Sequence, residues 1–308
     1  MKAIQIHQFG GPEELKYEEA PMPKINPDDV LIKVFATSIN PVDWKVREGE
    51  MKQIQFKFPL ILGWDVSGVI TEVGSDVKNF EVGQEVYSRP DLPRNGTYAE
   101  FVAVKAGSIA EKPRSISHVE AASIPLAGLT AWQGIFDHGK LELGQKILIH
   151  GASGGVGTLA VQLAKWKGAY VIGTASENNI DFLKELGADE VIDYKNQQFE
   201  KELKDIDVVF DTIGGETQKK SVEVLKTGGI LVSTVGVQDE EAFKAKNIQT
   251  HQFMAQSYPE QLKQMADLVD SGKLKPIINQ VFPLEEIAKA QKVSEEGHTR
   301  GKIAIKVI

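Results

Sequence analysis

The sequence contains no cysteine. This absence excludes disulfide bonds, thiol nucleophiles and thiolate metal sites, and it fits a reducing compartment. No apolar run approaches the roughly 18 residues that cross a bilayer. The amino-terminal stretch MKAIQIHQFGGPEEL also lacks an apolar core of signal-peptide length. We therefore expect a cytoplasmic protein without a membrane partner.

An excess of basic residues is missing as well. The chain has 35 basic and 43 acidic side chains, which gives a formal net charge of −8. This balance, and the lack of a basic strip interleaved with aromatic residues, argues against a nucleic-acid partner. The histidines show no metal-ligand spacing. They are His7, His118, His138, His150, His251 and His298.

The order of apolar segments predicts an α/β protein with two domains in its 308 residues. Over the first 120 or so residues, short β-branched segments alternate with Gly, Pro, Asn and Asp, which indicates a β-rich domain. Residues 115–136 then predict a helix. From residue 146 onward, buried strands alternate with helices, one of them expected over 216–229. That alternation is typical of a parallel sheet covered by helices.

A glycine-rich stretch, HGASGGVG, lies at residues 150–157 between a predicted strand and a predicted helix. Gly151, Gly154 and Gly157 form G-x-x-G-x-x-G, which departs from the usual dinucleotide pattern at its second glycine. Glycines still permit a tight turn and close backbone approach, and the helix amides face an anion. Ser153 adds a hydroxyl donor. A purely structural turn is the alternative, which the strand–helix context disfavours.

The end of the next strand indicates which dinucleotide is bound. NAD sites usually carry Asp or Glu there, to hold the ribose diol. Here the strand VIGTA is followed by Ser176, whose neutral side chain does not repel a 2′-phosphate. Tyr194 ends the third strand and offers a further donor, or else packs at the strand end. Glu177 is a counter-signal, so we expect NADPH with NADH possible.

These motifs resemble the medium-chain dehydrogenase/reductase superfamily, and most of all its zinc-free quinone oxidoreductase branch. The resemblance runs along the whole chain. It rests on SINPVDWKVREG, FPLILGWDVSGVITEVG, VGQEVY, GTYAEF, PLAGLTAWQ, HGASGGVGTLAVQLAK, LGADEVIDY, VFDTIGGET and GKLKP. It implies a GroES-like β-rich catalytic domain over 1–122, completed by 259–308. It also implies a Rossmann doubly wound parallel sheet over 123–258, and a homodimer.

The resemblance further implies that no metal takes part. Zinc-dependent members place Cys and His where this chain has Asn40 and Trp64, and neither an amide nor an indole is a usual zinc ligand. Without a Lewis acid, the expected reaction is hydride delivery to an acceptor already activated by conjugation, a quinone or an α,β-unsaturated carbonyl. Its developing oxyanion needs only hydrogen-bond donors. An enoyl-thioester reductase and a non-catalytic NADP(H)-binding structural or regulatory protein are the alternatives.

Carried over residue by residue, the resemblance implies that Asn40 points its amide at the substrate carbonyl; a turn-forming Asn-Pro is the alternative. Asp43 is a polar neighbour of the emptied metal position, as is Asp65, or else a turn residue. Related reductases often carry Lys where this chain has Asn178, which weakens the selectivity for NADPH. The implied contacts of the pyrophosphate are Ser153, Gly154, Gly155 and Val156, and those of the adenosine ribose are Ser176 and Tyr194. The implied contacts of the nicotinamide are Thr130, Ile213, Val235, Phe253 and Ala255, and Lys302 is a further candidate for cofactor contact.

Overall fold

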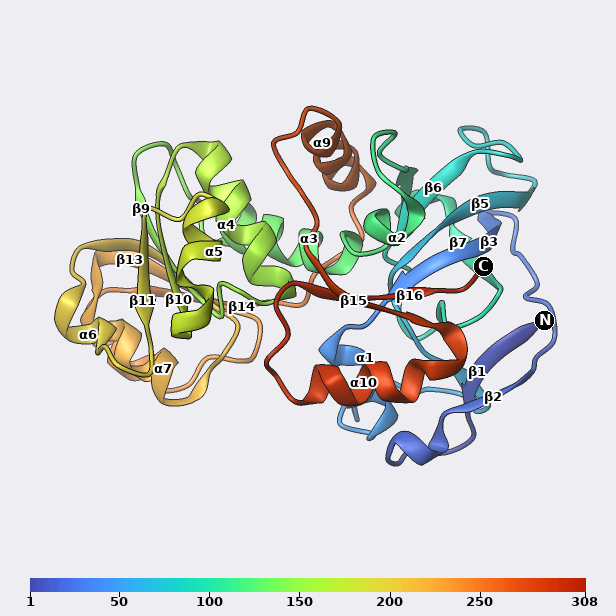
Figure 1. Ribbon diagram of the computed structural model, residues 1–308, viewed down its shortest axis with the longest axis horizontal. Coiled ribbons are helices and arrows are strands. Elements are labelled where there is room, and N and C mark those ends of the chain that lie inside the picture. The colour runs from blue at the N-terminus through green and yellow to red at the C-terminus, as the bar shows by residue number, and fades with distance from the viewer. The chain divides into compact units, whose positions relative to one another are not determined.

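A computed structural model describes residues 1–308, which divide into two compact units (Figure 1). Unit 1 comprises Met1–Ala127, Ser257–Gly272 and Pro276–Ile308, and unit 2 comprises Gly128–Gln256 and Lys273–Lys275. The sequence placed the two boundaries after residues 122 and 258, whereas the structure divides after Ala127 and Gln256. No helix of either unit is both long enough and apolar enough to cross a bilayer.

Unit 1 is built on two sheets. The larger has the strand order β15-β16-β3-β5-β6-β8, with β7 also paired to β3, and the smaller has the order β2-β1-β4. All pairs are antiparallel except β15 with β16. The strands are β1 (Lys2–Ile6), β2 (Lys16–Glu19), β3 (Asp29–Ser38), β4 (Leu60–Ile61), β5 (Val66–Val73), β6 (Glu85–Ser88), β7 (Phe101–Lys105), β8 (Ile109–Glu111), β15 (Ile278–Pro283) and β16 (Lys302–Lys306).

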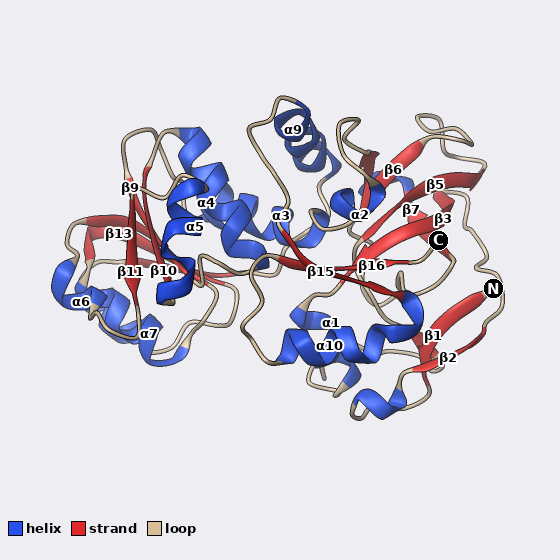
Figure 2. Ribbon diagram, in the orientation of Figure 1, coloured by secondary structure: helices blue, strands red, loops and turns tan.

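The helices of unit 1 are α1 (Pro41–Arg47), α2 (His118–Ala121), α9 (Pro259–Asp270) and α10 (Ile287–Glu295). Helices α1 and α10 lie side by side in Figure 2. The side chain of Arg47 is fully buried between them and donates to Gln291 Oε1 at 2.6 Å and to Glu295 Oε1 at 2.9 Å. This pairing joins an amino-terminal helix to the segment that returns to unit 1 at the end of the chain.

Unit 2 holds one six-stranded sheet in which every pair is parallel, in the order β11-β10-β9-β12-β13-β14. Counted from β9, this is the order 3-2-1-4-5-6 of a Rossmann fold. Helices lie on both faces of the sheet (Figure 2). The elements are β9 (Lys146–His150), α4 (Gly155–Lys167), β10 (Tyr170–Ala175), α5 (Ile180–Glu185), β11 (Glu190–Asp193), α6 (Phe199–Glu202), β12 (Ile206–Asp211), α7 (Gly215–Lys220), β13 (Leu225–Ser233), α8 (Glu240–Ala245) and β14 (Gln249–Gln252).

Strand β9 and helix α4 show why this sheet forms. Apart from its first residue, β9 is buried, as a parallel strand covered on both faces must be. Helix α4 is buried at every residue from Gly157 to Ala164 and stops at Gly168, whose φ of 86° is the left-handed conformation that ends many helices. Strand β14 lies at one edge of the sheet, and the homodimer that the resemblance implies stays a prediction.

Two expected helices are shorter in the structure. Residues 115–136 form α2, then α3 (Pro125–Trp132), followed by a π-helical turn over Gln133–His138. The break falls before Pro125, because proline disfavours helical geometry in the residue that precedes it.

Over 216–229, the expected helix is also shorter, since α7 ends at Lys220 and β13 already begins at Leu225. The sequence pattern does not show the reason, which is that Val224 and Leu225 are buried beside β12, where Leu225 pairs with Ile206.

Candidate active site

The glycine loop of unit 2 is the tight turn that its spacing predicts. Gly151 has a φ of 71°, and its carbonyl accepts the Gly154 amide at 3.1 Å. A Cβ at Gly157 would overlap the Gly151 carbonyl oxygen and lie 2.7 Å from Ala152 Cα. The backbone of the loop therefore packs directly on the first turn of α4, which only glycine at position 157 allows.

The amino terminus of α4 is left open by this turn. Its N-cap residue is Gly154, no side chain caps the helix, and the first helical bond runs from the Thr158 amide to the Gly154 carbonyl at 2.9 Å. The preceding amides thus keep the partial positive charge of a helix start. Ser153, Gly155 and Val156 are half-buried around them. This arrangement fits the pyrophosphate of a dinucleotide.

At the carboxyl ends of β12 and β13, two apolar side chains are exposed, Ile213 at 56% and Val235 at 42%. The loop after β12 lies against the glycine turn, since a Cβ on Gly151 would lie 3.0 Å from Ile213 Cδ1. Val235 packs beside the next residue of that loop, since a Cβ on Gly214 would lie 3.0 Å from Val235 Cγ2. The structure thus brings together two of the residues expected at the nicotinamide.

A buried carboxylate that the sequence reasoning missed holds the loop after β12. Asp211, with no exposed surface, accepts the amides of Ile213 at 2.9 Å and Gly214 at 3.0 Å. It also accepts Gln218 Nε2 at 2.7 Å and Ser233 Oγ at 3.2 Å. The available signal was an acidic residue that ends the apolar run VVF and stands three residues before Gly-Gly.

Gln218 extends the same network to the loop that carries Val235. Its Nε2 also donates to the Gly236 carbonyl at 2.6 Å, and its Oε1 accepts the Gln238 amide at 2.6 Å. The Val235 amide itself donates to Ser233 Oγ at 3.2 Å. This buried network therefore fixes the backbone that carries both exposed apolar side chains.

The three other residues expected near the nicotinamide lie on α3 and after β14. Thr130 is half-buried on α3, and Ala255 is buried. The Phe253 amide donates to the Ser233 carbonyl at 3.4 Å, and its ring lies 4.6 Å from the ring of His138. Phe253 therefore lies beside the carboxyl end of β13.

Ser176 and Tyr194 are neighbours at the carboxyl edge of β10 and β11. Ala175 pairs with Asp193, and the Tyr194 amide donates to the Ala175 carbonyl at 3.2 Å. Ser176 Oγ accepts Asn179 Nδ2 at 3.1 Å, while Tyr194 is 52% exposed. The two hydroxyls expected at the adenosine ribose thus share one edge of the sheet.

Unit 1 contains a buried polar group that we call the Asn40 cluster: Asn40, Asp43, Asp65, Tyr98 and Lys302. Asn40 is 2% exposed and is the N-cap residue of α1. Its Nδ2 donates to Asp65 Oδ2 at 2.6 Å, and its Oδ1 accepts Lys302 Nζ at 2.6 Å. Both ends of the amide are therefore held by charged side chains.

The two charged members of the cluster have further partners. Asp65 also accepts Ser38 Oγ at 2.5 Å and the Leu126 amide at 2.6 Å. Lys302 also donates to the Ile39 carbonyl at 2.8 Å and lies 3.5 Å from Asp65 Oδ2. Burial lowers the pKa of Lys302, against the opposing effect of the nearby carboxylates. Lys302, expected at the cofactor, is thus buried inside unit 1 with its ammonium on Asn40.

Asp43 and Tyr98 form the other side of the cluster. The Tyr98 hydroxyl donates to Asp43 Oδ2 at 2.5 Å, and the Asn40 amide donates to the same oxygen at 2.7 Å. Complete burial raises the pKa of Asp43 to about 7, even though both bonds and the charge of Lys302 act to lower it. Tyr98, which sequence reasoning did not assign, has its pKa raised by burial.

The donor set of this cluster does not fit zinc. Trp64, where zinc-dependent relatives were expected to place a histidine, is fully buried in the hydrophobic core. Nowhere do three or more His, Cys, Asp or Glu side chains gather closely enough to hold a metal ion. The Lys302 ammonium already binds the Asn40 oxygen, and it would repel a second cation there.

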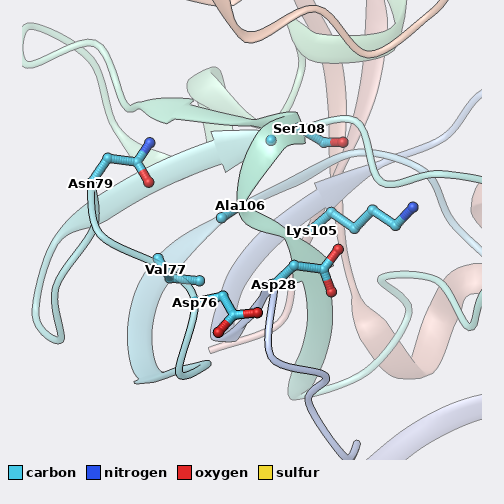
Figure 3. A pocket seen from close by; sticks show the side chains of 8 residues that line it. Asp28, Asp76, Val77, Asn79, Lys105, Ala106 and Ser108 are labelled. Carbon is cyan, nitrogen blue, oxygen red and sulfur yellow. The ribbon is translucent and has the colours of Figure 1, made fainter.

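A hollow of about 270 Å³ lies elsewhere in unit 1 (Figure 3). Its labelled carboxylates, Asp28 and Asp76, lie near each other at one side, and Lys105 lies on β7. The other lining residues are Val77, Asn79, Ala106, Gly107 and Ser108. None of the expected site residues lines it, so we do not assign it to the reaction.

Comparisons with known proteins agree with this architecture. The family model described as alcohol dehydrogenase GroES-like domain matches residues 26–114, and the one described as zinc-binding dehydrogenase matches residues 186–305. The human mitochondrial NAD(P)H oxidoreductase RTN4IP1 is 36% identical over the whole of this chain and 89% of its own length. The chloroplastic NADPH-dependent alkenal/one oxidoreductase of Arabidopsis thaliana is 36% identical over 99% of this chain and 79% of its own length.

A solved structure extends the likeness to three dimensions. The quinone oxidoreductase from Coxiella burnetii superimposes with a TM-score of 0.93 at 38% identity, covering 100% of this chain and 99% of its own. Identity and coverage at this level exceed what a shared fold alone requires. The chain therefore belongs to the quinone oxidoreductase branch of the medium-chain dehydrogenase/reductase superfamily.

Proposed function

We propose that this chain is a zinc-independent, NADPH-dependent oxidoreductase that delivers hydride to quinones or α,β-unsaturated carbonyls. The observation that carries the proposal is the Asn40 cluster. At the position where a metal would otherwise stabilise the substrate oxygen, this cluster offers a hydrogen-bond donor and a buried ammonium. The names of the relatives support the same class of acceptor and the same cofactor.

The nicotinamide supplies the hydride when the cofactor is bound. In unit 2 the open start of α4 binds the pyrophosphate, and Ile213 and Val235 provide an apolar wall that excludes water from the nicotinamide. In unit 1 Asn40 is the donor to the acceptor oxygen. Its Nδ2 carries two hydrogens and Asp65 takes one, which leaves one for the oxygen as negative charge develops there.

Turnover with a panel of acceptors tests the proposal. Quinones, enones and an enoyl thioester are each mixed with the protein and NADPH, and the loss of NADPH absorbance is followed. We expect turnover with a quinone or an enone. Turnover with the enoyl thioester alone would support the thioester alternative, and NADPH binding without turnover on any acceptor would support a non-catalytic binder.

We expect Asn40→Ala to lower kcat by about 100-fold, which is the usual effect of removing one donor to a developing oxyanion. The dissociation constant for NADPH should change less than twofold, because Asn40 lies in unit 1 and the glycine loop in unit 2. Steady-state kinetics and fluorescence titration measure the two quantities. Unchanged kcat would exclude Asn40 as the donor.

We expect Ser176→Asp to change the cofactor preference from NADPH to NADH. A carboxylate at the end of β10 repels a 2′-phosphate and accepts both ribose hydroxyls, so the ratio of the two dissociation constants should change by about tenfold or more. Asn247→Asp is the matched control, since it adds the same charge at an exposed residue before β14, at the opposite edge of the sheet. Equal affinity of the unmodified protein for NADPH and NADH would contradict the assignment of Ser176 and Tyr194 to a phosphate pocket.

A further inference from the structure

We propose that Lys302 is a positioning residue that, together with Asp65, fixes and polarises the Asn40 amide so that its remaining Nδ2 hydrogen is a strong donor to the substrate oxygen. The inference rests on the proposed function, because it concerns the donor that the reaction uses. It assigns to a buried ammonium the electrostatic contribution that a metal makes in zinc-dependent relatives.

The ammonium of Lys302 is fixed by its surroundings. Its three hydrogens face three acceptors, the Ile39 carbonyl at 2.8 Å, Asn40 Oδ1 at 2.6 Å and Asp65 Oδ2 at 3.5 Å. Its backbone is fixed as well, since the Lys302 amide donates to the Ile277 carbonyl at 2.8 Å. Gly301 precedes it with a φ of 73°, where an added Cβ would lie 2.9 Å from the Ile277 carbonyl carbon. The position of the charge is therefore set by β15 and β16.

The charges on either side of Asn40 permit only one orientation of its amide. An ammonium has no acceptor and a carboxylate has no donor, so Lys302 binds the amide oxygen and Asp65 binds the amide nitrogen. A flipped amide would place its N–H groups against Lys302 and its oxygen against Asp65. The free Nδ2 hydrogen thus points in one direction.

The same two charges strengthen that hydrogen as a donor. A positive charge at the oxygen and a negative charge at the nitrogen both favour the resonance form in which the amide nitrogen is positive. Hydrogen bonds that polarise one group in this way reinforce one another, most of all where water is excluded. Asn40 is 2% exposed, Lys302 5% and Asp65 fully buried, so the effect is little screened.

A purely structural role explains this ion pair poorly. Burying an ammonium and a carboxylate costs about as much as their attraction returns, and well-packed apolar residues often stabilise a core more. Because the buried pair of Lys302 and Asp65 flanks the candidate donor Asn40, we explain the pair by its effect on that donor.

The test is a double-mutant cycle in the full-length protein, measured with NADPH and a quinone that the wild type reduces. We expect Lys302→Met to lower kcat by about 30-fold while the dissociation constant for NADPH changes less than twofold. In the Asn40→Ala background, the same substitution should lower kcat less than twofold further, because Lys302 acts through Asn40. Lys306→Met, at the exposed end of the same strand, is the matched control and should leave kcat unchanged.

Additive losses in the cycle, or full activity of Lys302→Met, would overturn the inference. If Lys302→Met does not fold, Lys302→Gln keeps donors for Ile39 and Asn40 without the charge, and the same kcat loss is expected of it. A readout independent of turnover is the side-chain NMR signal of Asn40. The chemical shifts of its two Nδ2 hydrogens should differ more than those of a solvent-exposed asparagine, and both variants should reduce this difference. A wild type without turnover on any acceptor refutes the proposed function, whereas unchanged Asn40 signals refute this inference alone.

Discussion

Gly157→Ala is expected to lower the free energy of unfolding by about 3 kcal/mol and to weaken NADPH binding at least 100-fold. The added Cβ would overlap the Gly151 carbonyl and crowd Ala152, and both are backbone groups that no side-chain rotation relieves. Overpacking of this kind usually costs about 1–3 kcal/mol. Relief requires the glycine turn to move off α4, which displaces the amides that face the pyrophosphate. Urea unfolding and fluorescence titration with NADPH measure the two effects.

Gly154→Ala is the matched control within the same turn. Gly154 has a φ of −78°, which alanine adopts freely, and a Cβ there would approach only the Gly151 carbonyl, at an ordinary 3.4 Å. Its free energy of unfolding should stay within about 1 kcal/mol of the wild type, since alanine is only a poorer N-cap than glycine. Equal losses in the two variants would show that the close approach at Gly157 does not govern the stability of the turn.

Asp43→Asn is expected to remove a pH dependence of stability worth about 3 kcal/mol between pH 5 and pH 8. Burial raises the pKa of Asp43 to about 7 from an ordinary 3.8. Between these values the unfolded chain has released the proton that the folded protein keeps, so stability falls as the pH rises. The contribution of Asp43 to stability has its full value below about pH 4, and the fall levels off above about pH 7. Asparagine keeps an acceptor for Tyr98 and the Asn40 amide without titrating.

The measurement is the difference in unfolding free energy between wild type and Asp43→Asn, taken from urea unfolding at several pH values. His150, whose pKa burial lowers to about 4, acts in the opposite direction, but it is present in both proteins and its effect cancels in the difference. We expect the wild type to lose stability relative to the variant as the pH rises. A difference that stays constant from pH 5 to pH 8 would refute a raised pKa for Asp43.

Much of unit 2 could be predicted from the sequence because its signals are local. Apolar runs such as KILIH form the buried strands, and the glycine spacing of residues 151–157 specifies the turn onto α4. Ser176 and Tyr194 each follow a strand, and adjacent parallel strands end at the same edge. Local signals failed at residues 225–229, where the sequence pattern predicts a helix. In the structure these residues extend β13 beside β12, so tertiary contacts override the local pattern.

The amino-acid sequence by itself determined the alternation of strands and helices, the anion-binding turn, the absence of cysteine ligands and the family to which these belong. Only the tertiary structure decided what surrounds Asn40, because its partners come from distant parts of the chain. Lys302 lies 262 positions away and Tyr98 lies 55 positions from Asp43. Strand β16 pairs with β3 and so brings its lysine to the start of α1. Burial in that core then shifts the pKa values of Asp43 and Lys302, because removal from water favours the neutral form of each group while oppositely charged neighbours favour the charged form.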